Sequence, residues 1–225
     1  MSKTKICAML VQYDKTVPNA LELFETVKKL DVDCWGFKDI GLPREDLLKL
    51  GKMMKETGKP LNMEIMTDTE DEWVESAIFA HEAGVENCMG GYYSKKVMDK
   101  CHELGMKYYP FIGRLEGNPH MLQGTPEEII GLAKEAIDAG CDGICVPVYR
   151  FVGNIPELMK ALNDNIDVPV CLAGSINSKE RIDESIKYGI SQLNIGSSFF
   201  TGDFAPNKGI AENIEQAMAW SKEND

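Results

Sequence analysis

The sequence predicts an α/β fold of the (β/α)8 barrel class. A helix-like run, a glycine and a short apolar strand follow one another along the chain, and the 225 residues hold about eight such strands. Alternating strands and helices are typical of parallel sheets in which helices form the crossovers. Eight strand–helix units in a chain of this length match a compact closed barrel.

The glycine of this repeat stands where a helix ends, a position that needs a residue able to adopt positive φ. Before it, apolar residues recur at helical spacing, as at Ile129, Leu132, Ala133 and Ala136. After it comes a short β-prone run. The repeat contains Gly58, Gly84, Gly105, Gly140 and Gly189.

Three further strands complete the set of eight. They are K-I-C-A-M-L-V-Q (5–12), V-D-C-W-G-F-K (32–38) and V-P-V-C-L-A-G (168–174). The segment T-P-E-E (125–128) is typical of a helix start with a capping box. A doubly wound open sheet is the alternative, but it needs fewer strands and a glycine-rich turn after the first strand, which D-K-T-V-P-N (14–19) lacks.

Length and composition favour one domain spanning residues 1–225. Hydrophobic residues make up 44% and charged residues 27% of the chain, which suits a soluble protein with a large core. No linker-like stretch divides the chain. Neither a long apolar run nor a signal-peptide pattern occurs, so we expect a cytoplasmic protein.

Charge and cysteine usage exclude several classes of partner. A net charge of -12 disfavours nucleic acid and anionic membranes, because both require a basic patch. Small anions remain compatible, since a few backbone N–H groups and a local cation can hold them. The seven cysteines form neither a C-x-x-C motif nor a Cys/His cluster, which argues against zinc.

Two strand ends near the C-terminus carry glycine and serine. In a (β/α)8 barrel the active site lies at the carboxyl ends of the strands, and a phosphate often binds after strands 7 and 8. The segments A-G-S-I (173–176) and N-I-G-S-S-F (194–199) fall at those two places. Glycines there let oxygen atoms approach backbone N–H groups, although two ordinary polar loops are the alternative interpretation.

This last quarter of the chain resembles the phosphate-binding (β/α)8 barrel superfamily, of the ribulose-phosphate-binding type. The segment A-G-S-I-N (173–177) is similar to the G-G-I segment of those enzymes, and I-G-S-S-F (195–199) to their glycine-plus-small-residue segment after strand 8. The resemblance implies a phosphate-binding role for Gly174, Ser175, Gly196, Ser197 and Ser198.

No single family of that superfamily fits the rest of the chain. Hexulose-phosphate synthases carry D-x-K-x-x-D at strand 3, where this chain has L-N-M-E-I-M-T-D (61–68). The 2-keto-3-deoxy-6-phosphogluconate aldolases carry a Schiff-base lysine on strand 6, where it has G-I-C-V-P-V (143–148). K-I-C-A (5–8) is similar to the catalytic K-I-C-G of phosphoribosylanthranilate isomerase, but the acid partner is absent and Cys7 lies well before its strand end.

Strand alternation selects two candidate catalytic residues. In the strand ending at Lys38, the bulky Trp35 and Phe37 share the outer face, so Lys38 points into the barrel mouth. In the next strand the same alternation turns Asn62 and Glu64 inward. A buried carboxylate beside a lysine is costly unless paired. The two residues are either a structural ion pair or a catalytic pair.

A desolvated lysine can lose its proton, attack a carbonyl and form an iminium that draws electrons from a breaking carbon–carbon bond. Glu64 could then move a proton. Alternatively, Lys38 stays charged and stabilises an enediolate oxygen, as an isomerase or epimerase requires. The sequence does not distinguish a Schiff-base lysine from a charged lysine at this position.

The segment L-E-G-N-P-H-M-L-Q-G (115–124) is the longest loop and is expected to act as a lid. Arg114 could reach an anionic group from it, and His120 could act as acid or base. Further candidates for lining the substrate are Gln12, Tyr149 and Arg150.

The sequence therefore predicts an enzyme acting on a small phosphorylated sugar or oxo-compound. A carbon–carbon lyase (aldolase) using Lys38 is the first interpretation, with Arg114 as a third catalytic residue. A sugar-phosphate isomerase or epimerase using Glu64 as base, and a non-catalytic phospholigand-binding barrel, are the alternatives. No cofactor is predicted, although Glu64, Asp39 and a substrate oxygen could hold a divalent metal ion. Barrels of this size are often homo-oligomers.

Overall fold

The computed structural model describes residues 3–117 and 120–223 and confirms the (β/α)8 barrel. Its barrel strands are β1 Lys5–Met9, β4 Cys34–Lys38, β5 Leu61–Ile65, β6 Asn87–Tyr92, β7 Lys107–Phe111, β10 Ile144–Val146, β11 Val170–Ala173 and β12 Gln192–Ile195. Among the described residues these eight strands close into a barrel in the order β1-β12-β11-β10-β7-β6-β5-β4. Every neighbouring pair is parallel.

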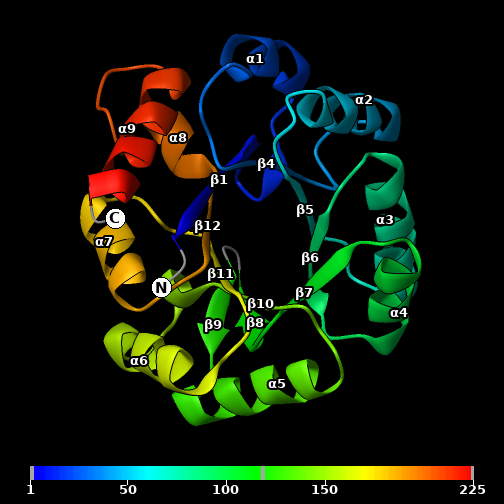
Figure 1. Cartoon of the computed structure of the whole chain (residues 1–225), viewed down its shortest axis with the longest axis vertical. Helices are drawn as coiled ribbons and strands as arrows, with labels where there is room; N and C mark the ends of the chain where they lie inside the picture. The colour runs from blue at the N-terminus through cyan, green and yellow to red at the C-terminus, as the bar shows by residue number, and fades with distance from the viewer. Residues whose placement is uncertain (1–2, 118–119, 224–225) are drawn as a thin grey trace.

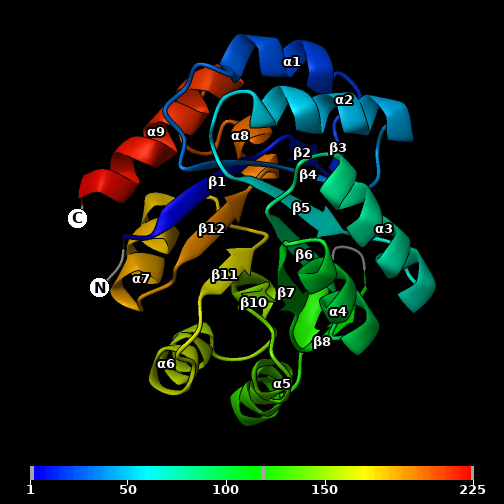
Figure 2. The same ribbon diagram turned by 45° about the vertical axis from the view of Figure 1, so that its right-hand side comes forward.

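Helices surround the strands on the outside (Figure 1). They are α1 Ala20–Val27, α2 Arg44–Lys55, α3 Glu70–Glu82, α4 Lys95–Glu103, α5 Pro126–Asp138, α6 Ile155–Asn165, α7 Lys179–Lys187, α8 Ser197–Thr201 and α9 Ile210–Glu223. A short 3₁₀ turn, η1 Val148–Arg150, precedes α6. Figure 2 shows β1, β12 and β11 side by side, with α8 at the end of β12.

Local sequence signals explain where the helices begin and end. The expected capping box at α5 is present, because the Thr125 side chain accepts from the Glu128 N–H and Glu128 bonds back to Thr125. Thr69 and Glu72 form the same arrangement at α3. All the glycines predicted at helix ends have positive φ, namely Gly58, Gly84, Gly105, Gly140 and Gly189.

The predicted strand alternation is confirmed. Trp35 faces outward and meets Phe24 of α1 edge to face, with ring centroids 5.0 Å apart. Phe37 joins the same core between strands and helices. Inside the barrel, Cys34 packs with Cys7 and Met9.

Two small antiparallel hairpins stand at the carboxyl ends of β1 and β7. The first joins β2 Val11–Gln12 to β3 Lys15–Thr16. The second joins β8 Arg114–Glu116 to β9 Met121–Gln123 and occupies most of the segment expected as a lid. Residues 118–119 of that segment lie outside the described residues, and its role as a lid stays a prediction. Over the ranges described, no helix is both long and apolar enough to span a membrane.

Two helical glycines provide a matched test of the helix packing. A Cβ at Gly51 of α2 would lie 2.8 Å from both Cβ and the carbonyl oxygen of Ala83, whereas one at Gly131 of α5 would meet nothing within 4 Å. We expect Gly51→Ala to destabilise the protein by about 1–3 kcal/mol, because α2 must move away from the end of α3. Gly131→Ala should stabilise it by about 1 kcal/mol, because alanine favours helix. Urea unfolding of both variants measures the two changes, and equal signs would contradict the packing described.

Candidate active site

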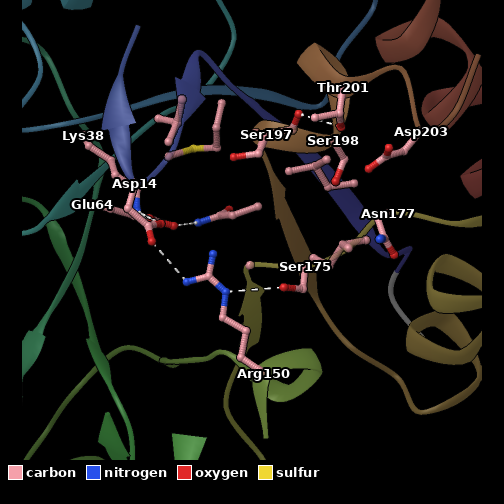
Figure 3. A pocket seen from close by; sticks show the side chains of 17 residues that line it. Asp14, Lys38, Glu64, Arg150, Ser175, Asn177, Ser197, Ser198, Thr201 and Asp203 are labelled. Carbon is pink, nitrogen blue, oxygen red and sulfur yellow. Dashed lines mark hydrogen bonds and ion pairs between the residues drawn. The ribbon is translucent and has the colours of Figure 1, made fainter. Parts of the chain in front are cut away.

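A cavity of about 240 Å³ opens at the carboxyl ends of the strands, where the site was expected. Figure 3 shows two groups of side chains facing each other across it. Lys38, Asp14 and Glu64 form one group, which we call the lysine cluster. The serines that follow β11 and β12 form the other.

Lys38 is the last residue of β4, and its side chain is only 7% exposed. Its Nζ lies 2.9 Å from Oδ1 of Asp14 and 3.1 Å from Oε2 of Glu64. Thr16 holds the strand end, because its hydroxyl donates to the Lys38 carbonyl oxygen at 2.8 Å and accepts from the Lys38 N–H at 2.9 Å. Backbone and side chain of Lys38 are thus both fixed.

The two carboxylates determine the charge of Lys38. Burial alone would lower the pKa of its amine, but the charges of Glu64 and Asp14 outweigh burial and raise that pKa above its ordinary value. Burial would likewise raise the pKa of Asp14, yet the charges of Lys38 and Arg150 bring it down to about 2. At neutral pH Lys38 is therefore an ammonium and Asp14 a carboxylate.

Glu64 is hydrogen-bonded through both oxygens. Its Oε2 faces Lys38, and its Oε1 accepts from Nδ2 of Asn194 in β12 at 2.8 Å. The side-chain Oδ1 of Asn194 accepts from Nε2 of Gln192 at 2.9 Å, which orients the Asn194 amide with its NH₂ group toward Glu64. A buried carboxylate needs such donors to offset its lost hydration.

Arg150 links the lysine cluster to the loop after β11. It ends the η1 turn, and its Nη1 lies 3.3 Å from Oδ2 of Asp14. Its Nε lies 3.4 Å from Oγ of Ser175. The guanidinium thus stands between the two groups of side chains (Figure 3).

Glycine is required at both of the predicted phosphate loops. A Cβ at Gly174, where φ is +83°, would lie 2.6 Å from Nε of Arg150. Only a residue without a side chain lets the guanidinium lie against this loop. A Cβ at Gly196 would lie 2.7 Å from the carbonyl oxygen of Val11, so glycine there allows β12 to approach β2.

Three serine hydroxyls complete this side of the cavity. Ser175 has a left-handed φ of 58° directly after Gly174. The Ser197 hydroxyl accepts from the Tyr13 N–H at 3.3 Å, and Ser198 is buried beside it. Hydroxyls, loop N–H groups and a nearby guanidinium are the donors that an anion requires.

The structure brings most of the candidates from the sequence into this one cavity. They are Lys38, Glu64, Arg150, Gly174, Ser175, Gly196, Ser197 and Ser198.

Four candidates lie outside the cavity. Arg114 belongs to the β8–β9 hairpin, pairs with Glu116 and has a side chain 69% exposed. His120 lines a neighbouring pocket beneath the same hairpin. Gln12 lies outside the barrel strands, because β1 ends at Met9 and the chain continues into the β2–β3 hairpin. The Tyr149 hydroxyl donates to the carbonyl oxygen of Arg181 in α7 at 2.7 Å.

Sequence reasoning missed Asp14 and Asn194. The alternation in Q-L-N-I (192–195) leaves Asn194 on the face opposite Leu193 and Ile195, so the argument applied to Glu64 would have found it. No sequence pattern indicates Asp14. It lies in the turn of the β2–β3 hairpin, and only the packing of that hairpin places it at the end of β4.

Asp39 does not share the cavity with Glu64. Its carboxylate accepts from the Met66 N–H at 2.8 Å and from the Ser76 hydroxyl of α3 at 2.7 Å. Burial raises its pKa despite these two bonds. Within residues 3–117 and 120–223, no three His, Cys, Asp or Glu residues are grouped as metal ligands. A divalent ion at Glu64 stays a prediction.

All seven cysteines are buried and free. Burial, together with a hydrogen bond to Cys34, raises the pKa of the Cys7 thiol well above its ordinary value. A thiol that acts as a base must be deprotonated, so the raised pKa also disfavours Cys7 as a catalytic base.

No family profile and no curated protein matches the sequence, but solved structures share its fold. Orotidine 5'-phosphate decarboxylase from Pyrococcus horikoshii OT3 has a TM-score of 0.68 and 15% identity over 97% of this chain and 98% of that chain. The native KDPGal structure has a TM-score of 0.66 and 16% identity, covering 99% and 95%. N-acetylmannosamine-6-phosphate 2-epimerase from Clostridium perfringens has a TM-score of 0.64 and 14% identity over 87% of this chain and 87% of that chain. These likenesses show that the chain has a (β/α)8 barrel fold.

The pairing of Asp14 predicts a pH-dependent contribution to stability. Its pKa is depressed from 3.8 to about 2, so the contribution is complete above about pH 5 and is lost as the pH falls through about 2. We expect Asp14→Asn to cost about 2 kcal/mol near neutral pH and less at each lower pH in that window. Urea unfolding over the range measures this. Asp71→Asn, at a side chain 93% exposed, is the control, and a pH-independent deficit in Asp14→Asn would contradict the prediction.

Proposed function

We propose that the protein is an enzyme acting on a small phosphorylated sugar or oxo-compound. The observation that carries this proposal is that one cavity joins the buried lysine cluster to two glycine–serine loops backed by Arg150. An anion binds at the loops, and the carbonyl group of the same molecule lies at Lys38. Two of the structures with this fold are named for phosphorylated compounds, orotidine 5'-phosphate and N-acetylmannosamine 6-phosphate, which supports the proposal.

The reaction that the lysine cluster supports best is proton transfer next to a carbonyl, as in an isomerase or epimerase. Glu64 removes a proton from the carbon beside the carbonyl, and the electron pair moves to the carbonyl oxygen. The Lys38 ammonium stabilises the negative charge that develops there. In an isomerase, the hydroxyl proton on that carbon then passes to the former carbonyl oxygen while Glu64 delivers its proton to the former carbonyl carbon. In an epimerase, a proton instead returns to the same carbon from the opposite face.

The charge of Lys38 is the reason for this choice. The sequence alone favoured a lysine that loses its proton through burial, and hence an aldolase. With two carboxylates at 2.9 and 3.1 Å the pKa of the amine is raised instead, which disfavours the neutral nucleophile.

A carbon–carbon lyase is the second candidate, favoured by the burial of Lys38 between two acids. Either Asp14 or Glu64 could accept the lysine proton as Nζ attacks a substrate carbonyl and water leaves to form the iminium. The expectations of a bound divalent ion and of a homo-oligomer remain predictions beside either reaction.

We expect Arg150→Gln to weaken the binding of inorganic phosphate and glycerol phosphate by about tenfold or more, because a charge-assisted hydrogen bond is lost. Arg114→Gln is the matched control, since that side chain pairs with Glu116 outside the cavity. Isothermal titration calorimetry measures both affinities. Equal affinities for the two variants would place the anion elsewhere.

A second experiment separates the reactions. The protein is incubated in deuterated water with a pool of phosphorylated aldehydes and ketones, and a parallel sample is reduced with borohydride. We expect deuterium to enter the substrate carbon beside the carbonyl, and Glu64→Gln, but not the exposed-site control Glu116→Gln, to abolish this uptake. A borohydride-stable adduct on the Lys38 peptide would support the lyase instead. Ligand binding with neither signal would support a phospholigand-binding barrel.

A further inference from the structure

A second pocket lies beside the lysine cluster at the same end of the barrel. Its volume is about 260 Å³, and it sits at the ends of β5, β6 and β7, under the β8–β9 hairpin. We call it the aromatic pocket. Its walls include Ile65, Met66, Trp73, Tyr92, Phe111 and Leu115.

Consecutive glycines shape this pocket. Gly90 and Gly91 both have left-handed φ, and the register between β6 and β7 shifts between Met89 and Tyr92. A Cβ at Gly91 would lie 3.0 Å from the Trp73 ring. A Cβ at Gly90 would lie 2.6 Å from the Ile65 carbonyl oxygen and 3.0 Å from the Phe111 ring. Irregularities of this kind are frequent beside functional sites, and here they make room for two aromatic rings.

The aromatic rings are held in place by their own polar groups. The Trp73 indole N–H donates to the Thr67 carbonyl oxygen at 2.6 Å, and the Tyr92 hydroxyl accepts from the Leu115 N–H at 3.2 Å. The Trp73 and Tyr92 rings meet edge to face with centroids 6.3 Å apart. Their remaining faces are preorganised apolar surface.

Met66 joins the aromatic pocket to the lysine cluster. It lines the pocket, and its Sδ lies 3.4 Å from Nζ of Lys38. Ile65, another wall residue, directly follows Glu64 in β5. A group attached to a substrate carbon at Lys38 therefore has this pocket as its neighbouring space.

We propose that the aromatic pocket binds an aromatic or heteroaromatic ring carried by the substrate. The inference rests on the proposed function and narrows it to a phosphorylated oxo-compound that bears a planar ring. A dry cavity of about 150 Å³ is enough for benzene, so 260 Å³ accommodates a substituted ring. The ring faces gain apolar contact there, while Thr67, Asp68 and His120, which also line the pocket, offer polar atoms to a substituent on the ring.

One polar atom suggests a substituent on that ring. Thr67 also lines the pocket, and its buried hydroxyl has no hydrogen-bond partner among the residues described. Such groups are uncommon in folded proteins. Turning the Thr67 side chain toward the pocket would let a ring nitrogen or a ring hydroxyl supply the missing partner.

The test follows the Trp73 indole N–H by NMR, assigned with Trp73→Phe. Five probes are titrated: phenol, tetramethylammonium, inorganic phosphate, a series of phenylalkyl phosphates of increasing chain length, and alkyl phosphates of matched length. We expect phenol to shift the Trp73 signal. One phenylalkyl phosphate should shift it and also bind about tenfold more tightly than its alkyl counterpart, a gain typical of aromatic contacts with area burial.

Two variants keep the proposal falsifiable if one of them folds poorly. Phe111→Leu and Trp73→Leu should each remove the gain from the ring while leaving the affinity for inorganic phosphate unchanged, both measured by isothermal titration calorimetry. Tyr93→Leu, which replaces an exposed aromatic residue that follows Tyr92 in the chain and does not line the pocket, is the matched control and should keep the gain.

The outcomes separate this inference from the proposed function. If phenol shifts the Trp73 signal but no phosphate compound binds, the result supports ring binding in the aromatic pocket and contradicts the proposed phosphate site. If phosphates bind, but phenylalkyl phosphates bind no more tightly than alkyl phosphates, ring binding in the aromatic pocket is overturned while the proposed phosphate site is supported. A Trp73 signal that responds to tetramethylammonium and not to phenol would also overturn it, because the pocket would then hold a cation.

Discussion

The buried ammonium of Lys38 between two carboxylates is the interaction on which the rest of the site depends. It ties β4 to β5 through Glu64 and to the β2–β3 hairpin through Asp14. Asn194 extends the network to β12, and Arg150 extends it to η1. Removing Lys38 would leave the buried Glu64 carboxylate without its counter-charge, which typically costs about 3–5 kcal/mol. The charges therefore position these segments relative to one another, in addition to the role in the reaction that we propose for them.

That network imposes a polar interior on a fold whose barrels are usually filled with branched apolar side chains. Hydrogen bonds continue below Glu64, from Asn194 to Gln192, while Asn62 accepts from Asn87 at 2.8 Å near the opposite end. Small thiols, such as that of Cys34, fill the space between these amides. Each buried amide needs a partner, so the interior is specified by hydrogen bonding as much as by volume.

The mouth of the barrel has three zones, with the lysine cluster in the middle. Glycine–serine loops with Arg150 offer donors for an anion on one side, and the aromatic pocket offers apolar faces on the other. Both side zones depend on glycines that let a side chain or a strand approach the backbone closely, as Gly174 does for Arg150 and Gly91 for Trp73. A substrate with one charged end, a central carbonyl and a planar ring fits this order of zones.

The sequence by itself determined the barrel, the helix ends and the inward direction of Lys38 and Glu64, because strand alternation, glycine at helix ends and capping boxes are local rules. It also located both glycine–serine loops, since a strand followed by glycine is visible in the chain. Only the tertiary structure brought Asp14 over Lys38, and it left Arg114 outside the cavity. Both depend on hairpins whose direction is set by packing. The charge of the lysine was likewise decided in three dimensions, because burial and carboxylate pairing act in opposite directions and only distances show which effect is larger.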